Sequence, residues 1–68
     1  MIKITITSMR VESYFSEVHP SFKEGETAFY IIRESGKRVS NYYHLESHAL
    51  KRAWEMVKTY GLTLVEPW

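Results

Sequence analysis

The first residues of the chain alternate apolar and polar side chains in the manner of a β-strand. Three isoleucines alternate with lysine and threonine over residues 2–7, and β-branched residues at period two favour a strand with one buried face. After Ser8 the alternation changes phase, so that Met9 and Val11 become the apolar positions. A change of phase exchanges the two faces of a strand, so we expect a bulge, a bend or the strand end near Thr7 and Ser8.

Two further β-rich runs, residues 27–34 and 37–44, flank Ser35 and Gly36. A two-residue loop that contains glycine is typical of a β-hairpin, because glycine adopts the positive φ that the turn requires. Both faces of this hairpin carry aliphatic or aromatic residues. One helix covers only one face of a small sheet, so we expect the other face to be exposed unless another segment or a partner covers it. That face carries Tyr30, Ile32 and Tyr42.

Residues 45–60 have the periodicity of an amphipathic helix, with Gly61 as a natural residue to end it. Its start is open: Ser47 is one candidate for the N-cap, and a start near His44 is the alternative. Its apolar arc consists of Leu45, Ala49, Ala53, Met56, Val57 and Tyr60, with Leu50 at the edge.

Trp54 lies off the apolar arc of this helix, roughly 125° from its centre at 100° per residue. Two interpretations follow. The ring folds back over the edge of the core, since tryptophan is usually substantially buried. Alternatively, Trp54 is an exposed anchor for a partner, because tryptophan is enriched at interface hot spots.

Residues 12–26 have no sustained period, although they include several apolar side chains. We expect a short helical turn around residues 12–18, in a segment that either packs over one edge of the core or forms a contact surface. Residues 62–65 predict a short last strand, and Trp68 either tucks into the fold or docks on another subunit. The sequence therefore predicts a single α+β domain over residues 1–68. Its small antiparallel sheet has three to four strands in the order β-loop-β-β-α-β, with one amphipathic helix packed on one face.

Composition narrows the setting of this domain. The chain has 68 residues, ten aromatic residues, no cysteine and a net charge of +1. So small a core cannot rely on disulfides, and dense aromatic packing or oligomerisation is the expected source of stability. The start of the chain lacks the apolar stretch of a signal peptide, and no apolar run has the length of a membrane span. These features predict a soluble cytoplasmic protein that does not act at a membrane.

The candidate chemistry is sparse. His44 and His48 are four residues apart with Glu46 between them, but this differs from the H-E-x-x-H pattern of zinc proteases. We interpret them as surface histidines near a helix start and expect no metal or cofactor. The chain has no G-x-S-x-G, P-loop or dinucleotide fingerprint, and it leaves little room for an enzyme-sized pocket. These observations predict that the protein is not an enzyme.

Two binding hypotheses remain. The first is a protein-binding module whose partner is an unidentified protein or a second copy of the chain, in a homodimer. Its candidate contacts are Tyr30, Ile32, Tyr42, Trp54 and Trp68. The alternative is a nucleic-acid-binding module with a basic strip on the hairpin and the helix, although acidic residues are interleaved with it. That strip consists of Arg33, Lys37, Arg38, Lys51, Arg52 and Lys58.

The order of elements over roughly residues 27–60 resembles that of small modules in which one helix backs a three-stranded sheet. The arm-binding domains of phage integrases are of this type, and the resemblance implies a sheet that reads DNA; it extends to no individual binding residue. The compact, motif-free and aromatic-rich chain is also similar to small accessory proteins with which phages block host machinery, anti-CRISPR proteins among them. This second likeness implies an inhibitor or adaptor that blocks a partner protein.

Overall fold

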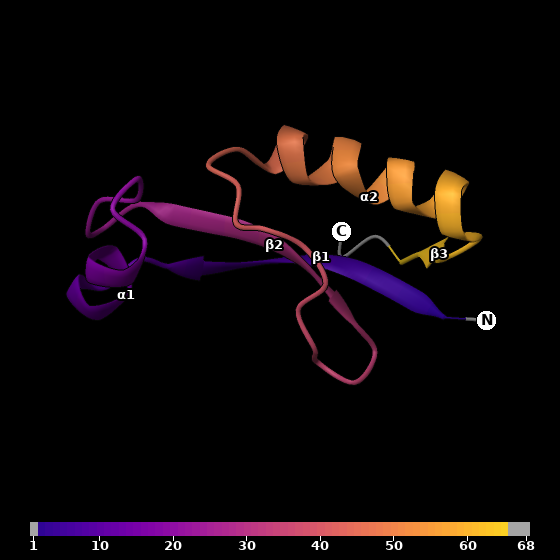
Figure 1. Ribbon diagram of the computed structural model, residues 1–68, viewed down its shortest axis with the longest axis horizontal. Helices are drawn as coiled ribbons and strands as arrows, with labels where there is room; N and C mark the ends of the chain where they lie inside the picture. Colours follow the sequence, from indigo (N-terminus) through magenta and orange to yellow (C-terminus); the bar gives the residue numbers. More distant parts are fainter. Residues whose placement is uncertain (1, 66–68) are drawn as a thin grey trace.

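A helix packed on one face of a small mixed sheet forms the body of the protein (Figure 1). The computed structural model describes residues 2–65. The elements are β1 (Lys3–Arg10), α1 (Ser13–Val18), β2 (Thr27–Arg33), α2 (Glu46–Tyr60) and β3 (Thr63–Leu64). In the sheet, β1 lies between an antiparallel β2 and a parallel β3. The predicted α+β fold is confirmed, but the sheet is mixed rather than antiparallel as predicted, because β3 pairs in parallel with β1.

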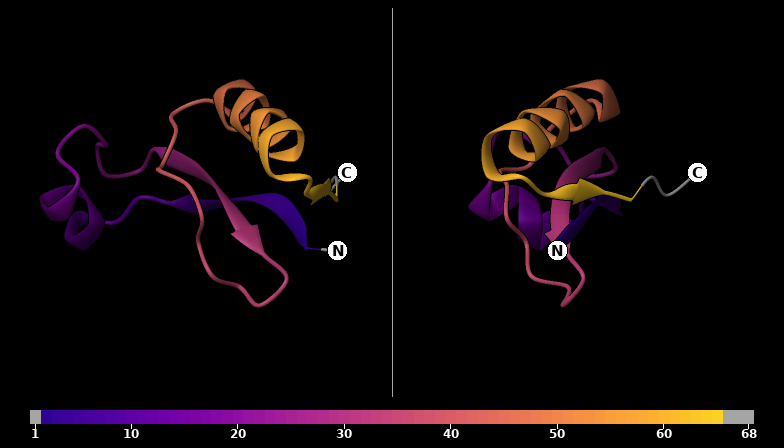
Figure 2. Two further views of the ribbon diagram at one scale, coloured as in Figure 1. Left: turned by 45° about the vertical axis from the view of Figure 1, so that its right-hand side comes forward. Right: turned by 90° about the vertical axis from the view of Figure 1, so that its right-hand side faces the viewer.

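The main core lies between α2 and one face of the sheet (Figure 2). Ile4 and Ile6 of β1 and Ile31 of β2 are buried there beneath α2. The helix contributes Ala49, Ala53 and Met56, and the two small alanines let the helix lie close to the strands. The expected amphipathic helix is therefore present. No helix within residues 2–65 combines the length and the apolar character needed to cross a membrane.

A second cluster of buried side chains lies on the opposite face of the same strands, toward their α1 end. Val11, Phe22 and Ala28 are buried in it, and Met9, Phe15 and Tyr42 pack around them. The register of β1 with β2 runs without interruption from Ile4–Arg33 to Arg10–Thr27. The predictions of a bulge and of a strand end near Thr7 and Ser8 are therefore wrong, since β1 continues to Arg10. The apolar positions change phase because α2 covers one face at one end of β1, while α1 and its loop cover the other face at the other end.

The second half of the predicted hairpin is not a regular strand. Residues 37–44 touch β2 only through two isolated bridges, Phe29–Tyr43 and Ile32–Arg38. Between the bonded pairs Ile31–Val39 and Phe29–Tyr43, residues 40–42 stand opposite the single residue Tyr30. Two extra residues therefore interrupt the ladder. The turn at Gly36 forms as expected, with φ of 89°.

At this interruption the hydroxyl of Ser40 replaces a backbone carbonyl as a hydrogen-bond acceptor. The backbone N–H of the buried Ile31 donates to Ser40 Oγ at 2.9 Å, in place of a carbonyl on a neighbouring strand. Ser40→Ala leaves this N–H without its partner, and we expect the free energy of unfolding to fall by about 1–3 kcal/mol. Urea unfolding measures the change. Ser35→Ala, in the exposed turn, is the control and stays within about 0.5 kcal/mol of wild type; equal midpoints for the two variants would contradict the role of Ser40.

The ends of α2 refine the predicted boundaries. Gly61 ends the helix in the left-handed conformation, with φ of 67°, as expected. The helix begins at Glu46 with Leu45 as N-cap residue, so Ser47 is not the N-cap, and the start agrees with the alternative of a start near His44 with another cap. Leu45 and Tyr60, assigned to the apolar arc, are exposed. They occupy the two ends of the helix, outside the turns between Ala49 and Val57 that pack on the sheet.

Candidate functional site

The second face of the sheet, where exposed residues were predicted, is half covered. Tyr42 lies in the second cluster, where its ring contacts Phe15 at 4.8 Å and His19 at 5.0 Å between centroids. Tyr30 contacts the Tyr42 ring edge-on at 5.3 Å and is partly buried, as is Ile32. The loop around α1 therefore supplies the cover for Tyr42. Tyr42 therefore packs in the second cluster. Tyr30 lies at the edge of this cluster, next to the part of the sheet face that the α1 loop leaves open.

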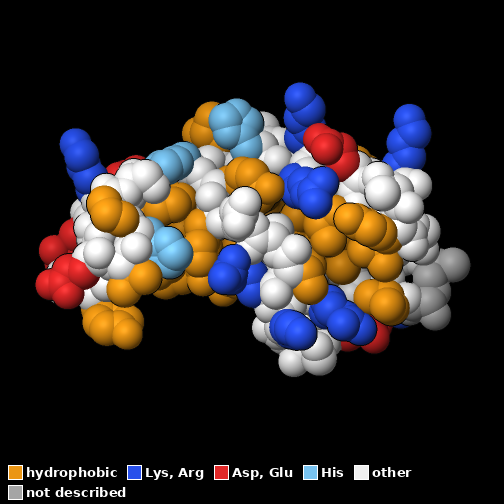
Figure 3. All heavy atoms as spheres, viewed as in Figure 1, with side chains coloured by type: hydrophobic (Ala, Val, Ile, Leu, Met, Phe, Trp, Pro, Cys, Tyr) orange, Lys and Arg blue, Asp and Glu red, His pale blue; other side chains and the backbone are white. Residues whose placement is uncertain are grey.

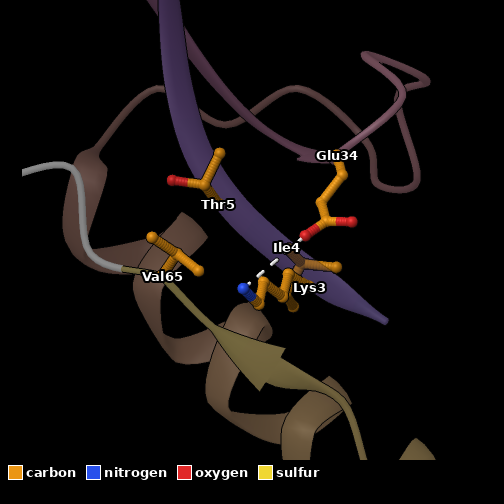
Figure 4. A pocket seen from close by; sticks show the side chains of 5 residues that line it. All are labelled: Lys3, Ile4, Thr5, Glu34 and Val65. Atoms are coloured by element: carbon orange, nitrogen blue, oxygen red, sulfur yellow. Dashed lines mark ion pairs between the residues drawn. The ribbon is translucent and has the colours of Figure 1, made fainter. Parts of the chain in front are cut away.

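Within residues 2–65, the part of this face that the α1 loop leaves open contains a small hollow beside β3, shown in Figure 4. Lys3 reaches across it to Glu34, with 3.9 Å between Nζ and Oε1. Thr5 and Val65 form the other walls, and Ile4 also lines it. Both charged groups of the pair are more than half exposed, so the ion pair contributes little to stability. The lining offers aliphatic contacts and one ion pair, which suits packing against an apolar group.

Trp54 lies on an outer flank of α2. Trp54 is 50% exposed and belongs to neither buried cluster. These observations favour the interpretation of an exposed ring over that of a ring folded back on the core. Residues three and four positions away share a helix flank. The apolar neighbours of Trp54 at this spacing are Leu50 and Val57, both partly buried against the main core. Its polar neighbours are Lys51 and Lys58, both exposed. These five residues are called the Trp54 flank below.

The predicted basic strip divides into separate groups. Arg38 and Arg52 line one hollow between α2 and residues 38–43. Lys51 lines an adjoining hollow together with Arg52. Arg33 lies in a different hollow, near Lys3 and Glu34. Lys58 belongs to the Trp54 flank and Lys37 to the exposed hairpin turn. The structure thus brings together Arg38, Arg52 and Lys51, and it separates the other three from them.

The histidines do not share a helix face. His44 precedes α2, so the four-residue spacing to His48 does not align the two rings as it would within a helix. The His44 ring stacks on Phe22 with centroids 4.0 Å apart, and its Nε2 lies 2.8 Å from the carbonyl oxygen of Ser21. His44 therefore fastens the chain before α2 to the loop after α1. Within residues 2–65 there is no group of three or more potential metal ligands placed to hold an ion.

The sequence did not predict all residues that line the hollow of Arg38 and Arg52. Tyr43 lines both hollows beside Arg52. Ser40 and Asn41 line the first one, from the two-residue interruption of the hairpin. Serine and asparagine are poor strand residues that bond readily to nearby backbone groups, and this was the available signal for an irregular edge. Trp68, predicted as a contact, lies outside the described residues.

No protein-family model, curated protein or solved structure matches this chain. The choice between functions therefore depends on the two surfaces of α2, one apolar around Trp54 and one basic around Arg52.

Proposed function

We propose that the protein is a non-enzymatic protein-binding module that uses the Trp54 flank as its contact surface. The observation that carries the proposal is a half-exposed tryptophan in the middle of a helix whose inner face packs in the main core. Trp54 is bounded by Leu50 and Val57 toward the core and by Lys51 and Lys58 toward solvent. An aromatic anchor with an apolar border and a charged rim has the composition of a protein–protein hot spot.

The charges on this flank indicate the kind of partner. Both lysines are exposed. Lys51 also borders the hollow that Arg52 and Glu55 line, where Glu55 Oε2 lies 3.8 Å from Arg52 Nη1. A complementary partner presents an apolar pocket for the indole and carboxylates beside it. We propose further that the protein acts as an inhibitor or adaptor of phage or mobile-element type, which blocks a surface of this partner. Its small size and aromatic-rich composition support this role.

The test is affinity capture from lysate of the source organism, treated with nuclease, with wild type and two variants. Trp54→Ala removes the anchor, and we expect a loss of about 2 kcal/mol in binding, or roughly 30-fold in affinity. Tyr14→Ala is the control, because Tyr14 is an aromatic residue that is 78% exposed on α1, away from the flank. It should capture the same protein as wild type. Equal capture by Trp54→Ala would overturn the proposal.

A second measurement identifies the case in which the partner is another copy of the chain. Size-exclusion chromatography with light scattering gives the mass of wild type and of Trp54→Ala. A homodimer that Trp54→Ala converts into a monomer assigns the flank to self-association. A monomer for both proteins leaves the heterologous partner as the ligand, which the capture experiment then has to show.

A further inference from the structure

We propose that the hollow between α2 and residues 38–43 binds phosphate groups of a nucleic-acid backbone. This site lies on the flank of α2 opposite Trp54 and goes beyond the proposed protein-binding function. It is lined by two arginines, one from the hairpin and one from the helix, together with four uncharged residues. The lining residues are Arg38, Val39, Ser40, Asn41, Tyr43 and Arg52.

The first observation is that two arginines line one hollow and that none of its six described lining residues is a carboxylate. Arg38 and Arg52 are 14 positions apart in the sequence and reach the hollow from different elements. Two positive side chains beside one hollow make an anion the favoured ligand there. A guanidinium presents a planar fork of N–H donors that matches phosphate oxygens, so a phosphate is a suitable anion for the hollow.

The second observation is that Arg38 is held in place before any ligand arrives. Its Nη1 donates to the carbonyl oxygen of Ser40, and its guanidinium lies over the Tyr42 ring at 4.5 Å from the centroid. Tyr42 is itself fixed by the aromatic residues of the second cluster. An arginine that is already oriented loses less conformational entropy on binding than a free one. One guanidinium carries five N–H groups, so most of its donors remain after the bond to Ser40.

Arg52 is oriented more loosely. Its Nη1 lies 3.8 Å from Glu55 Oε2, and both side chains are about half exposed. An exposed pair at this distance is weak, so a phosphate competes with it readily. Arg52 also lines the adjoining hollow with Lys51, His48, Tyr43 and Glu55, so this second hollow has one carboxylate beside its two basic side chains. Arg38, Arg52 and Lys51 therefore line two adjoining hollows, with Glu55 beside Arg52 in the second, and three cations along two hollows fit successive phosphates of a chain better than a single free phosphate.

The third observation is the distribution of charge over the whole molecule. Residues 33–60 contain six lysines and arginines and three glutamates, whereas residues 10–26 contain two basic and four acidic residues. In Figure 3 most acidic side chains gather at the α1 end, and basic ones spread over the part with the helix and hairpin. This asymmetry orients an approaching polyanion toward the basic half, although the net charge is only +1.

Fluorescence anisotropy with labelled single-stranded and duplex oligonucleotides tests this proposal. We expect wild type to bind at 50 mM salt and to lose affinity steeply toward 200 mM, as counterion release requires. The double variant Arg38→Gln/Arg52→Gln should lose about tenfold in affinity, and its salt slope should fall by about 0.7–0.9 for each lost phosphate contact. Arg52→Gln alone, which leaves the Arg38 hydrogen bond intact, should show half of the change in slope.

The matched control is Arg10→Gln/Lys23→Gln, which removes the same charge from the α1 half. It should retain affinity within about threefold of wild type, since general electrostatic attraction alone is weak at this distance. Equal losses for the two double variants would overturn the proposal, as would undetectable binding by wild type. Displacement of the oligonucleotide by an acidic peptide at equal charge concentration would also overturn it, because the hollow would then be selective for carboxylates. Trp54→Ala should leave oligonucleotide binding unchanged, so the two proposals fail separately.

Discussion

Replacing Ile31 by alanine is expected to lower the free energy of unfolding by about 2–5 kcal/mol, enough to unfold much of the protein. Ile31 has an exposed fraction of 0% and lies in β2, opposite Ile6 of β1 and beneath α2. Its side chain therefore contacts both layers of the main core, and its loss leaves a cavity that neither layer can close alone. A domain of this size buries only about 60% of its unfolded surface, so it has little stability to lose. Circular dichroism during urea unfolding gives the midpoint and the free energy.

The neighbouring isoleucine provides a matched control for this variant. Ile32 has the same side chain but points to the opposite, partly open face of β2, where it is only partly buried. Ile32→Ala should lower the free energy of unfolding by about 1 kcal/mol, close to the average for point mutants. A larger effect at Ile32 than at Ile31 would mean that the register of β2 is shifted by one residue, which would exchange the two faces.

Phe22→Ala is expected to lower the free energy of unfolding by about 3–5 kcal/mol through the second cluster. Phe22 is 3% exposed, and its ring stacks on His44 and contacts Phe15 edge-on at 5.7 Å. No residue of α1 is itself buried, so the buried Phe22 ring is a principal side-chain contact between the α1 loop and the second cluster. The variant should therefore release the loop as well as destabilise the domain. Limited proteolysis and amide hydrogen exchange over residues 12–26 measure the release, and urea unfolding measures the stability.

Two substitutions calibrate the Phe22 result. Phe22→Leu keeps most of the apolar volume and should cost less than about 1.5 kcal/mol, with the loop still protected. Tyr14→Ala removes an exposed ring from α1 and should stay within about 0.5 kcal/mol of wild type. If Phe22→Ala unfolds at the same urea concentration as Tyr14→Ala, the second cluster contributes nothing and its description as a core is wrong.

The sequence was most informative about α2, because the evidence for a helix is local. The apolar spacing from Ala49 to Val57 and the glycine at position 61 place the helix to within one residue of its observed end. Strand pairing is different. Alternation shows which side of β1 is apolar, but it does not say which strands lie beside it. The parallel pairing of β3 with β1 therefore had no signal in the sequence.

The change of phase after Ser8 shows a second limit. The observation was correct, since Met9 and Val11 do face away from Ile4 and Ile6. Two structures produce the same pattern: a bulge that rotates the strand, or an unbroken strand covered on different faces at its two ends. Only the position of the α1 loop distinguishes them. An apolar stretch without period, such as residues 12–26, is therefore a candidate for covering a second face.

The candidate sites depend on contacts between distant residues. The exposure of Trp54 was one of two readings of its angular position, and the packing of Leu50 and Val57 decides between them. The six basic residues form a strip along the sequence, but the fold assigns only Arg38, Arg52 and Lys51 to adjoining hollows. The position of residues 38–43 beside α2 determines that grouping. No local sequence pattern in residues 33–58 predicts it.

The central position of β1 has a consequence for the order in which the protein is made. β1 is the first strand along the chain, yet its parallel neighbour pairs residue 63 with residue 3. On the ribosome, β1 therefore waits with an unpaired edge until almost all of residues 3–63 has emerged. Closing so long a loop carries an entropic cost and slows folding compared with a fold of local contacts. We therefore expect this domain to fold late during synthesis. Its sheet is complete only when β3, the shortest strand, has been synthesised and pairs with β1.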